Sequence, residues 1–354
     1  MPDSTRYIPS LHRLALLTAA ATFPLIFMGG LVTSHGAGMS VPDWPNSYGY
    51  NMFLFPPRLW VGGILYEHTH RLMGTAVGML SIALTFWAWK TEPRRWVCWL
   101  ATAVLGAVIL QGVLGGLRVV LVELNLAVVH ACFAQAFFCL AALVAVVTSR
   151  WWIGTEGFSS SEAEGAAGRA VFRVAAVALF SIYLQLVIGA LMRHYGAGLA
   201  IPDLPLAYGK ILPPLTDDGL RRVNEMRLWD AGLPRVTLAQ VWLHFAHRVG
   251  AVVVVAHVLW AALRVLGRHR RPGLVAPAVG MIVLLATQAT LGVLTVLYRK
   301  PADVASAHVA VGALLLVTTF VLAARAARLY LPGVRAGRAE AAGFDVPAAE
   351  LVTA

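Results

Sequence analysis

Residues 29–49 read GGLVTSHGAGMSVPDWPNSYG, and residues 189–209 read GALMRHYGAGLAIPDLPLAYG. Ten of the 21 aligned positions are identical, whereas average residue usage would give about one or two by chance. The similarity continues downstream in the same order, at an offset of 177 or 178 residues. The downstream pairs are EHTHR at 67–71 with HFAHR at 244–248, Gln111 with Gln288, Gly115 with Gly292, and His130 with His308. The sequence therefore predicts an internal duplication, and the extra length of the second copy falls on the charged segment 215–230.

The composition indicates a protein that crosses a membrane many times. Of the 354 residues, 59% are hydrophobic and only 13% are charged, whereas soluble chains carry roughly 25% charged residues. This excludes an ordinary soluble enzyme, and it also excludes a disordered chain. The apolar runs are about 20 residues long, enough to cross ~30 Å of hydrocarbon. The eight predicted spans are 14–34, 62–89, 96–118, 124–148, 170–192, 237–263, 274–297 and 304–328.

The predicted fold is an all-α polytopic membrane protein, because lipid offers no partners for free backbone groups. Each copy of the repeat holds four spans, so both copies start on the same side and the repeats are parallel. We expect two tandem four-helix bundles, related by a pseudo-two-fold axis along the membrane normal, with cofactor sites between facing helices. The predicted parts are an N-terminal half at 1–152, a flexible cytoplasmic link at 153–168, a C-terminal half at 169–334 and a disordered tail at 335–354.

The charges predict the orientation of the chain. There are 28 Lys and Arg residues against 17 Asp and Glu, and the basic residues lie mainly in short segments between apolar runs. They therefore orient helices rather than bind nucleic acid, and the positive-inside rule places both termini in the cytoplasm. The first apolar run has no small-residue cleavage site after it, so we expect it to be retained. The three cysteines lie in apolar runs without CxxC spacing, which argues against a disulfide or a zinc site.

Four histidines occupy equivalent positions in the two copies. His70 and His247 lie in the second span of each half, His130 and His308 lie in the fourth, and all four lie in the outer part of the membrane. Two axial imidazoles are what a low-spin haem iron needs, and small residues such as Gly74 leave clearance for a flat macrocycle. The simpler alternative is that each histidine donates a hydrogen bond between helices. Because the four recur in pairs at matching depth, the sequence favours two haem sites.

Glu67 lies three residues before His70, so both side chains lie on one helix face. Its counterpart in the second half is His244, so the halves differ beside the predicted iron ligands. This asymmetry predicts one site for chemistry and one for electrons or structure. The alternative is an ion pair between Glu67 and Arg71, four residues on. Arg71 and its counterpart Arg248 are predicted to bind anionic groups near the outer surface, such as haem propionates.

These motifs together resemble the haem A synthase family. The resemblance rests on GGLVTSHGAGMSVPDWP, ExxHR at 67–71, QGVLGGLRV at 111–119, His130, HxxHR at 244–248 and His308. It covers roughly residues 10–328, with all motifs in order. It implies an eight-helix, duplicated membrane protein that carries haem. The implied activity is oxidation of the C8 methyl group of haem O to a formyl group, through two hydroxylations and loss of water from a geminal diol, which gives haem A for terminal oxidases.

The resemblance also implies four iron ligands and one catalytic carboxylate. The implied ligands are His247 and His308 for a permanently bound haem b, and His70 and His130 for the substrate haem O. Glu67 would be the carboxylate that accepts a proton or stabilises positive charge, and His244 belongs to the non-catalytic cofactor site. Some family members carry a cysteine pair in each large outer loop, whereas this chain has no cysteine in either loop.

Two other functions also fit parts of the sequence. A bis-histidine dihaem b cytochrome that only transfers electrons would need the paired histidines but gives no reason for Glu67. A transporter built from parallel repeats predicts helices broken at mid-membrane, whereas the breaks here lie outside the spans. For the enzyme we expect the bacterial inner membrane, a haem O synthase and an unidentified electron donor as partners, and a possible homo-oligomer.

Overall fold

The computed structural model describes residues 6–155, 158, 161–229 and 232–331. Eight of its helices are long and apolar enough to cross a membrane, which confirms the all-α prediction and the eight predicted spans. These helices are α1 (Pro9–Ser34), α2 (Gly63–Thr91), α3 (Arg95–Val120), α4 (Leu124–Val147), α6 (Glu162–His194), α8 (Leu238–Arg268), α9 (Val275–Leu297) and α10 (Ala302–Tyr330). The shorter helices are η1 (Met52–Leu54), η2 (Pro57–Leu59), α5 (Arg150–Gly154) and α7 (Asp217–Trp229).

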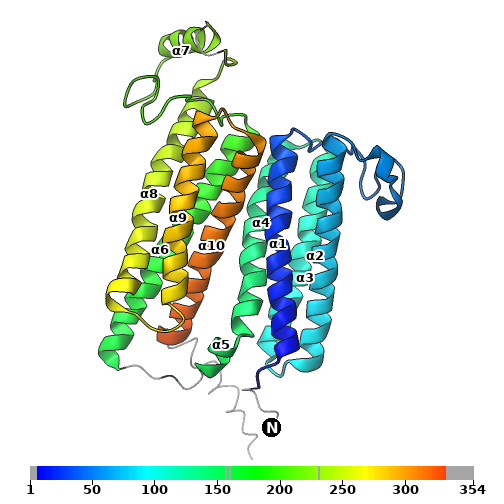
Figure 1. Ribbon diagram of the computed structural model, residues 1–354, viewed down its shortest axis with the longest axis vertical. Helices are drawn as coiled ribbons and strands as arrows, with labels where there is room; N and C mark the ends of the chain where they lie inside the picture. Colours follow the sequence, from blue (N-terminus) through cyan, green and yellow to red (C-terminus); the bar gives the residue numbers. More distant parts are fainter. Residues whose placement is uncertain (1–5, 156–157, 159–160, 230–231, 332–354) are drawn as a thin grey trace, which may run out of the picture.

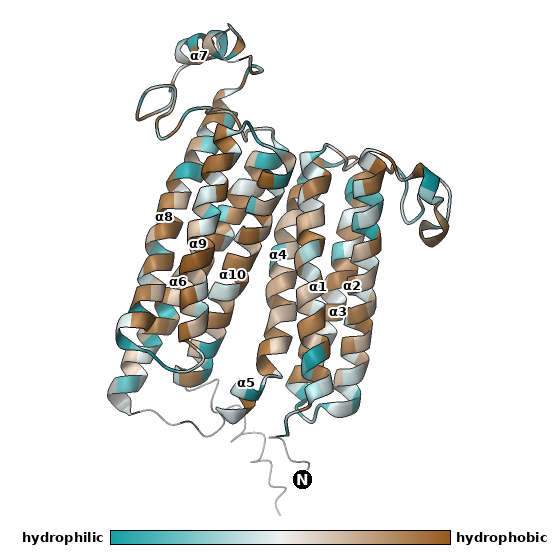
Figure 2. Cartoon of the chain, viewed as in Figure 1, coloured by the Kyte–Doolittle hydropathy of each residue, from teal (hydrophilic) through white to brown (hydrophobic). Residues whose placement is uncertain are grey.

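The long helices carry their apolar residues on the outside as well as inside. Large hydrophobic side chains such as Met79, Phe86, Trp99, Phe180 and Val252 are exposed on their outer faces. In water such a surface would be a liability, but it is what a helix facing lipid presents. Figure 2 shows apolar residues along the length of the helices and hydrophilic residues gathered mainly at their ends and in the loops.

The helices form two groups that stand side by side (Figure 1). Helices α1 to α4 pack on one another, helices α6, α8, α9 and α10 do the same, and the groups meet through α1, α4, α6 and α10. The loops after α1 and α6 lie at one end of the molecule, whereas the N-terminal end of α1 and the C-terminal end of α10 lie at the other. The axis predicted to relate the two groups stays a prediction from the sequence.

The link between the groups is partly helical. Helix α6 begins at Glu162 rather than near residue 170, because Ser161 and Glu164 form a capping box that starts the helix early. Helix α5 covers Arg150–Gly154 at the other end of the link. The tail predicted to be disordered, 335–354, lies outside the described residues.

The charged segment in the second large loop is a helix, α7, where the sequence analysis assigned none. The hydroxyl of Thr216 accepts a hydrogen bond from Gly219 N, and Asp217 and Asp218 occupy the first turn. Both features stabilise the positive end of a helix. Arg227, near the end of α7, is buried and donates to the carbonyl oxygens of Leu199, Ala200 and Pro234. These hydrogen bonds hold α7 against the loop that follows α6.

A close contact joins the two groups near the end of the molecule that carries the loops after α1 and α6. Gly30 of α1 lies against Ser306 of α10, and a Cβ built on Gly30 would lie 3.2 Å from Ser306 Cα. Ser34 Oγ lies 3.0 Å from Ser306 Oγ. Arg193 of α6 donates to the carbonyl oxygen of Gly30 and to Ser34 Oγ. The absence of a side chain at Gly30 therefore lets α1 and α10 approach each other.

Replacement of Gly30 by Val should destabilise this contact, because overpacking a tight site costs about 1–3 kcal/mol. We expect a lower midpoint of thermal unfolding in detergent. Gly78→Val in α2 is the matched control, since a Cβ on Gly78 would have nothing within 4 Å. Equal midpoints for the two variants would contradict this account of the contact.

Candidate active site

Each group of helices holds one pair of histidines. In the first group the ring centres of His70 (α2) and His130 (α4) lie 6.5 Å apart, with their planes at 81°. In the second group the ring centres of His247 (α8) and His308 (α10) also lie 6.5 Å apart, at 66°. The four histidines selected from the sequence are therefore brought together in the expected pairs.

The spacing of each pair suits one metal held between two imidazoles. Two imidazoles that bind one metal from opposite sides, each through a bond of about 2.0–2.1 Å, have ring centres about 6.3–6.5 Å apart. No cluster of three or more His, Cys, Asp or Glu side chains that could hold an ion occurs among the described residues. Two protein ligands per site fit an iron that arrives with four porphyrin nitrogens. The arrangement thus fits haem better than a bare ion.

The ring nitrogens of the two pairs have different surroundings. The Nδ1 atoms of His70 and His130 are buried without a partner in the described part of the chain, which is costly unless something else binds the ring. In the second pair, Gln185 Nε2 lies 3.1 Å from His247 Nδ1. The corresponding residue before His70 is Leu25, which offers no amide.

Glycines on neighbouring helices set the position of all four rings. The distance from an ideal glycine Cβ to the nearest ring atom, Cε1, lies between 2.9 and 3.1 Å in every case. The contacts are Gly29 with His70, Gly115 with His130, Gly189 with His247, and Gly292 with His308. By contrast, Gly74 on the same helix as His70 would have nothing near its Cβ. The clearance around the rings therefore comes from other helices, which the sequence pattern did not show.

The loop after α1 has a fixed shape that the loop after α6 repeats. The carboxylate of Asp43 accepts hydrogen bonds from the N–H groups of Tyr48 and Gly49, and Asp203 does the same for Tyr208 and Gly209. Pro45 and Pro205 both follow cis peptide bonds. Each Pro-Asp-x-Pro segment is therefore part of a turn that its own aspartate closes through hydrogen bonds.

The charge of Asp43 is stabilised by its surroundings. Burial opposes ionisation of this carboxyl, but hydrogen bonds from Gly49 and Tyr48 and the charge of Arg71 outweigh it, so the pKa of Asp43 lies below its usual value. A charged acceptor makes the turn stronger than a neutral one would.

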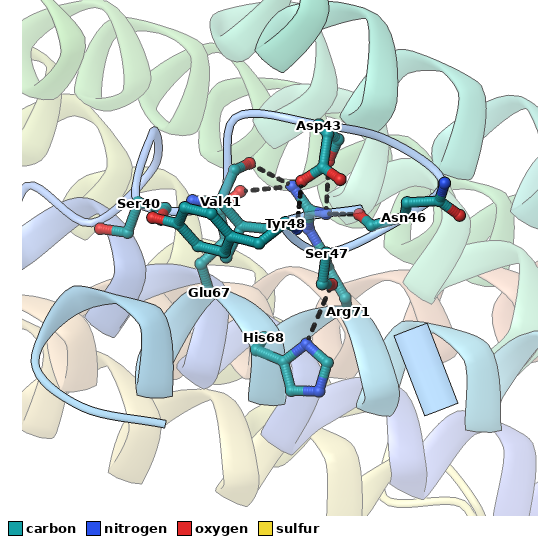
Figure 3. A network of polar contacts seen from close by, with 9 residues as sticks. All are labelled: Ser40, Val41, Asp43, Asn46, Ser47, Tyr48, Glu67, His68 and Arg71. Carbon is teal, nitrogen blue, oxygen red and sulfur yellow. Dashed lines mark hydrogen bonds and ion pairs between the residues drawn. The ribbon is translucent and has the colours of Figure 1, made fainter. Parts of the chain in front are cut away.

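Arg71 ties helix α2 to this loop (Figure 3). Its terminal nitrogens donate to the carbonyl oxygens of Val41, Asp43 and Asn46 and to Glu67 Oε1. The ion pair with Glu67 measures 2.9 Å, and Glu67 is only 2% exposed. Glu67 Oε2 accepts a further hydrogen bond from Val41 N at 2.9 Å. The ion pair that the sequence left open as an alternative is therefore present.

In the second group, the residues that correspond to Glu67 and Arg71 also bind the backbone of a loop. His244 Nδ1 accepts a hydrogen bond from Ile201 N, as Glu67 does from the corresponding Val41. Arg248 donates to the carbonyl oxygens of Ile201 and Leu206. Both arginines therefore hold the backbone of the loop that follows α1 or α6, a role that the sequence analysis missed. Propionate binding by Arg71 and Arg248 stays a prediction, and the four terminal N–H groups of Arg71 already have partners.

Two further polar residues near the first pair were not selected from the sequence. His68 is fully buried, lies 3.3 Å through Nδ1 from Ser47 Oγ and packs against the rings of Phe55 and Trp60. Arg118 lies in the last turn of α3, with its guanidinium close to Gly38. A cation at the outer end of a predicted span runs against the positive-inside pattern, and that signal could have identified Arg118.

A family comparison agrees with this geometry. The family model described as cytochrome oxidase assembly protein (COX15-CtaA) matches residues 62–320, which include both histidine pairs. The chain belongs to this family. With eight apolar helices, a member of this family is an integral membrane protein.

Several curated relatives are named Heme A synthase. The protein from Symbiobacterium thermophilum is 27% identical over 291 residues, which cover 80% of this chain and 85% of the relative. The protein from Shouchella clausii is 28% identical over 290 residues, covering 79% and 89%. The protein from Shewanella oneidensis is 24% identical over 328 residues, covering 85% and 92%. The similarity thus extends over most of both chains.

Replacement of Gly115 by Ala is expected to displace the His130 ring, because the added Cβ would lie 2.9 Å from Cε1. Haem bound between His70 and His130 should fall several-fold and its low-spin absorption should weaken. Gly112→Ala on the same helix is the matched control, since nothing lies within 4 Å of its Cβ. Absorption spectra and extracted haem per protein would measure the effect. Identical spectra for the two variants would show that the glycine does not position the ring.

Proposed function

We propose that this protein is a haem A synthase, which oxidises the C8 methyl group of haem O to a formyl group and so supplies haem A for terminal oxidases. The observation that carries the proposal is the pair of histidines in each group, with ring centres 6.5 Å apart. The family match and the relatives named Heme A synthase support it.

We assign different roles to the two pairs. His247 and His308 would hold a resident haem b, with His244 beside them, and this haem would supply one-electron redox capacity when bound. His70 and His130 would hold haem O as the substrate. The glutamine amide at His247 fixes one ring of the cofactor pair, whereas the unpartnered Nδ1 atoms of His70 and His130 leave these rings less firmly held, which suits a ligand that comes and goes.

Glu67 is the proposed catalytic carboxylate of the substrate site. A carboxylate has about four acceptor positions, and two of these are used by Arg71 and Val41. The remaining positions can accept a proton or stabilise positive charge beside the substrate. Arg71 and the loop hold the carboxylate at a fixed position, since its side chain is buried between them.

We infer the following setting for the enzyme. The termini and the basic segments at their end of the molecule face the cytoplasm by the positive-inside rule, so the histidine pairs lie toward the outer side of a bacterial inner membrane. The halves 1–152 and 169–334 would be the two copies of a parallel duplication. A haem O synthase, an electron donor and a second copy of the chain are candidate partners.

A bis-histidine dihaem b cytochrome is the second candidate function. It is favoured by the equal ring spacing in the two pairs, because electron transfer needs two axial imidazoles at each haem and no catalytic group beside them. The residue at position 67 distinguishes the candidates, since it is a carboxylate in one half and an imidazole in the other.

Conversion of supplied haem O, followed by mass analysis of the extracted haems, tests the proposed function. Wild-type protein should yield haem A, whereas Glu67→Gln should keep bound haem but lose most conversion, by about a hundredfold or more for loss of a general base. Glu225→Gln is the matched control, because it makes the same chemical change at an exposed residue of α7, outside both proposed haem sites, and should leave conversion near wild type. Unconverted haem O in wild-type protein would favour the cytochrome. Equal conversion in both variants would leave Glu67 a purely structural residue.

His308→Ala removes one imidazole of the cofactor pair. We expect loss of the resident haem b and of its low-spin spectrum, because one remaining axial ligand cannot hold a low-spin iron. A reduced-minus-oxidised spectrum with extracted haem types would measure this. Full haem b content in the variant would contradict the assignment of His247 and His308.

A further inference from the structure

A cavity of about 260 Å³ opens at the outer ends of α1, α3, α4 and α6. It therefore lies where the two groups of helices meet, and outside the histidine pairs themselves. Its polar lining includes Thr33, Arg118, Glu123 and His194. Ala127, one turn before His130 on α4, also lines it, and residues three apart share a helix face. The cavity thus adjoins the first histidine pair.

Arg118 is the unusual side chain of this cavity. Within the described residues its guanidinium has no hydrogen bond and no ion pair, whereas Arg71, Arg227 and Arg248 all donate to backbone carbonyls. Arg118 is partly buried and lines the cavity together with Ala127, one turn before His130. Its charge acts on His70, His130 and Glu67, but the carboxylate of Glu67 is bonded to Arg71 and Val41 instead. A partly buried cation near the hydrocarbon is costly unless an anion meets it.

His194 approaches the same cavity from the other half of the chain. Its ring has no described hydrogen bond, and the equivalent residue in the first copy is Ser34. The preceding residue, Arg193, donates to the Gly30 carbonyl and to Ser34 Oγ. These bonds hold the end of α6 against α1, so His194 is kept at the cavity.

Glu123 is the one carboxylate in this lining, and it is exposed. Within the described ion pairs it has no partner, and it does not neutralise Arg118. A guanidinium and an imidazole that converge without partners form a site for a carboxylate.

We propose that this cavity binds a propionate carboxylate of the porphyrin seated between His70 and His130, with Arg118 and His194 as the hydrogen-bond donors. The proposal rests on the proposed function. It assigns to Arg118 the anion contact that the sequence had placed on Arg71, whose terminal N–H groups are already used. It also makes the substrate site incomplete without the second half, since His194 comes from α6.

The test is an optical titration of the purified full chain with two probes. One is iron(III) protoporphyrin IX with free propionic acid groups, and the other is its dimethyl ester. Esterification removes both carboxylate charges and leaves the macrocycle unchanged. The absorbance change that wild-type protein shows and His70→Ala does not is the signal of binding between His70 and His130. Wild-type protein should bind the free acid about 10–100-fold more tightly than the ester, the range for one or two charged hydrogen bonds.

Arg118→Gln should lose most of this preference and leave the affinity for the ester unchanged, while Arg118→Lys should keep part of it. Arg58→Gln is the matched control, because Arg58 lies exposed in η2 on the same side of the molecule and does not line the cavity. His194→Phe should reduce the preference by a smaller factor than Arg118→Gln.

Equal affinity of wild-type protein for the two probes would overturn the proposal, and so would an equal loss for both probes in Arg118→Gln, which indicates a structural role. If either of these results is found and the wild-type protein still converts haem O, the proposed function stands and only the propionate site is excluded. A wild-type protein that binds neither probe at the first pair overturns both proposals.

Discussion

The contact between each histidine ring and a glycine of the neighbouring helix is the constraint on which the two sites depend. A helix can approach an imidazole this closely only where it has no side chain, because any Cβ would fall within about 3 Å of the ring. The glycine thereby fixes how near the helices come and where each ring lies between them. Ring centres 6.5 Å apart in both pairs follow from helices locked at this separation.

The two halves share a frame and differ in the groups that fill it. Each outer loop is folded by an aspartate that caps its own turn and is held by an arginine from the helix below. Within that frame Glu67 and His244 accept the same backbone hydrogen bond. One half therefore carries a buried carboxylate one turn before its histidine on α2, and the other carries an imidazole one turn before its histidine on α8. Under the proposed function, this one unequal position would separate a cofactor site from a reactive site.

Much of the fold and part of the site could be predicted from the sequence. The eight spans follow from apolar runs of membrane length, and the histidine pairs follow from the repeat, because equivalent residues of a duplicated chain occupy equivalent places. Helix α7 was missed because its sequence is short and strongly charged, which indicates a loop, although Leu220, Val223 and Met226 recur at helical spacing. The early start of α6 was missed for the same reason, since Ser161 and Glu164 cap a segment that composition alone describes as a linker.

The sequence by itself determined the number of spans and the pairing of His70 with His130 and of His247 with His308. These depend on local composition or on positions that recur. Only the tertiary structure decided which groups those residues meet. It showed that Arg71 binds a loop, that glycines from other helices face the rings, and that Arg118 and His194 converge at one cavity from opposite halves. Such contacts join residues far apart in the chain, and their distances are set by how whole helices pack.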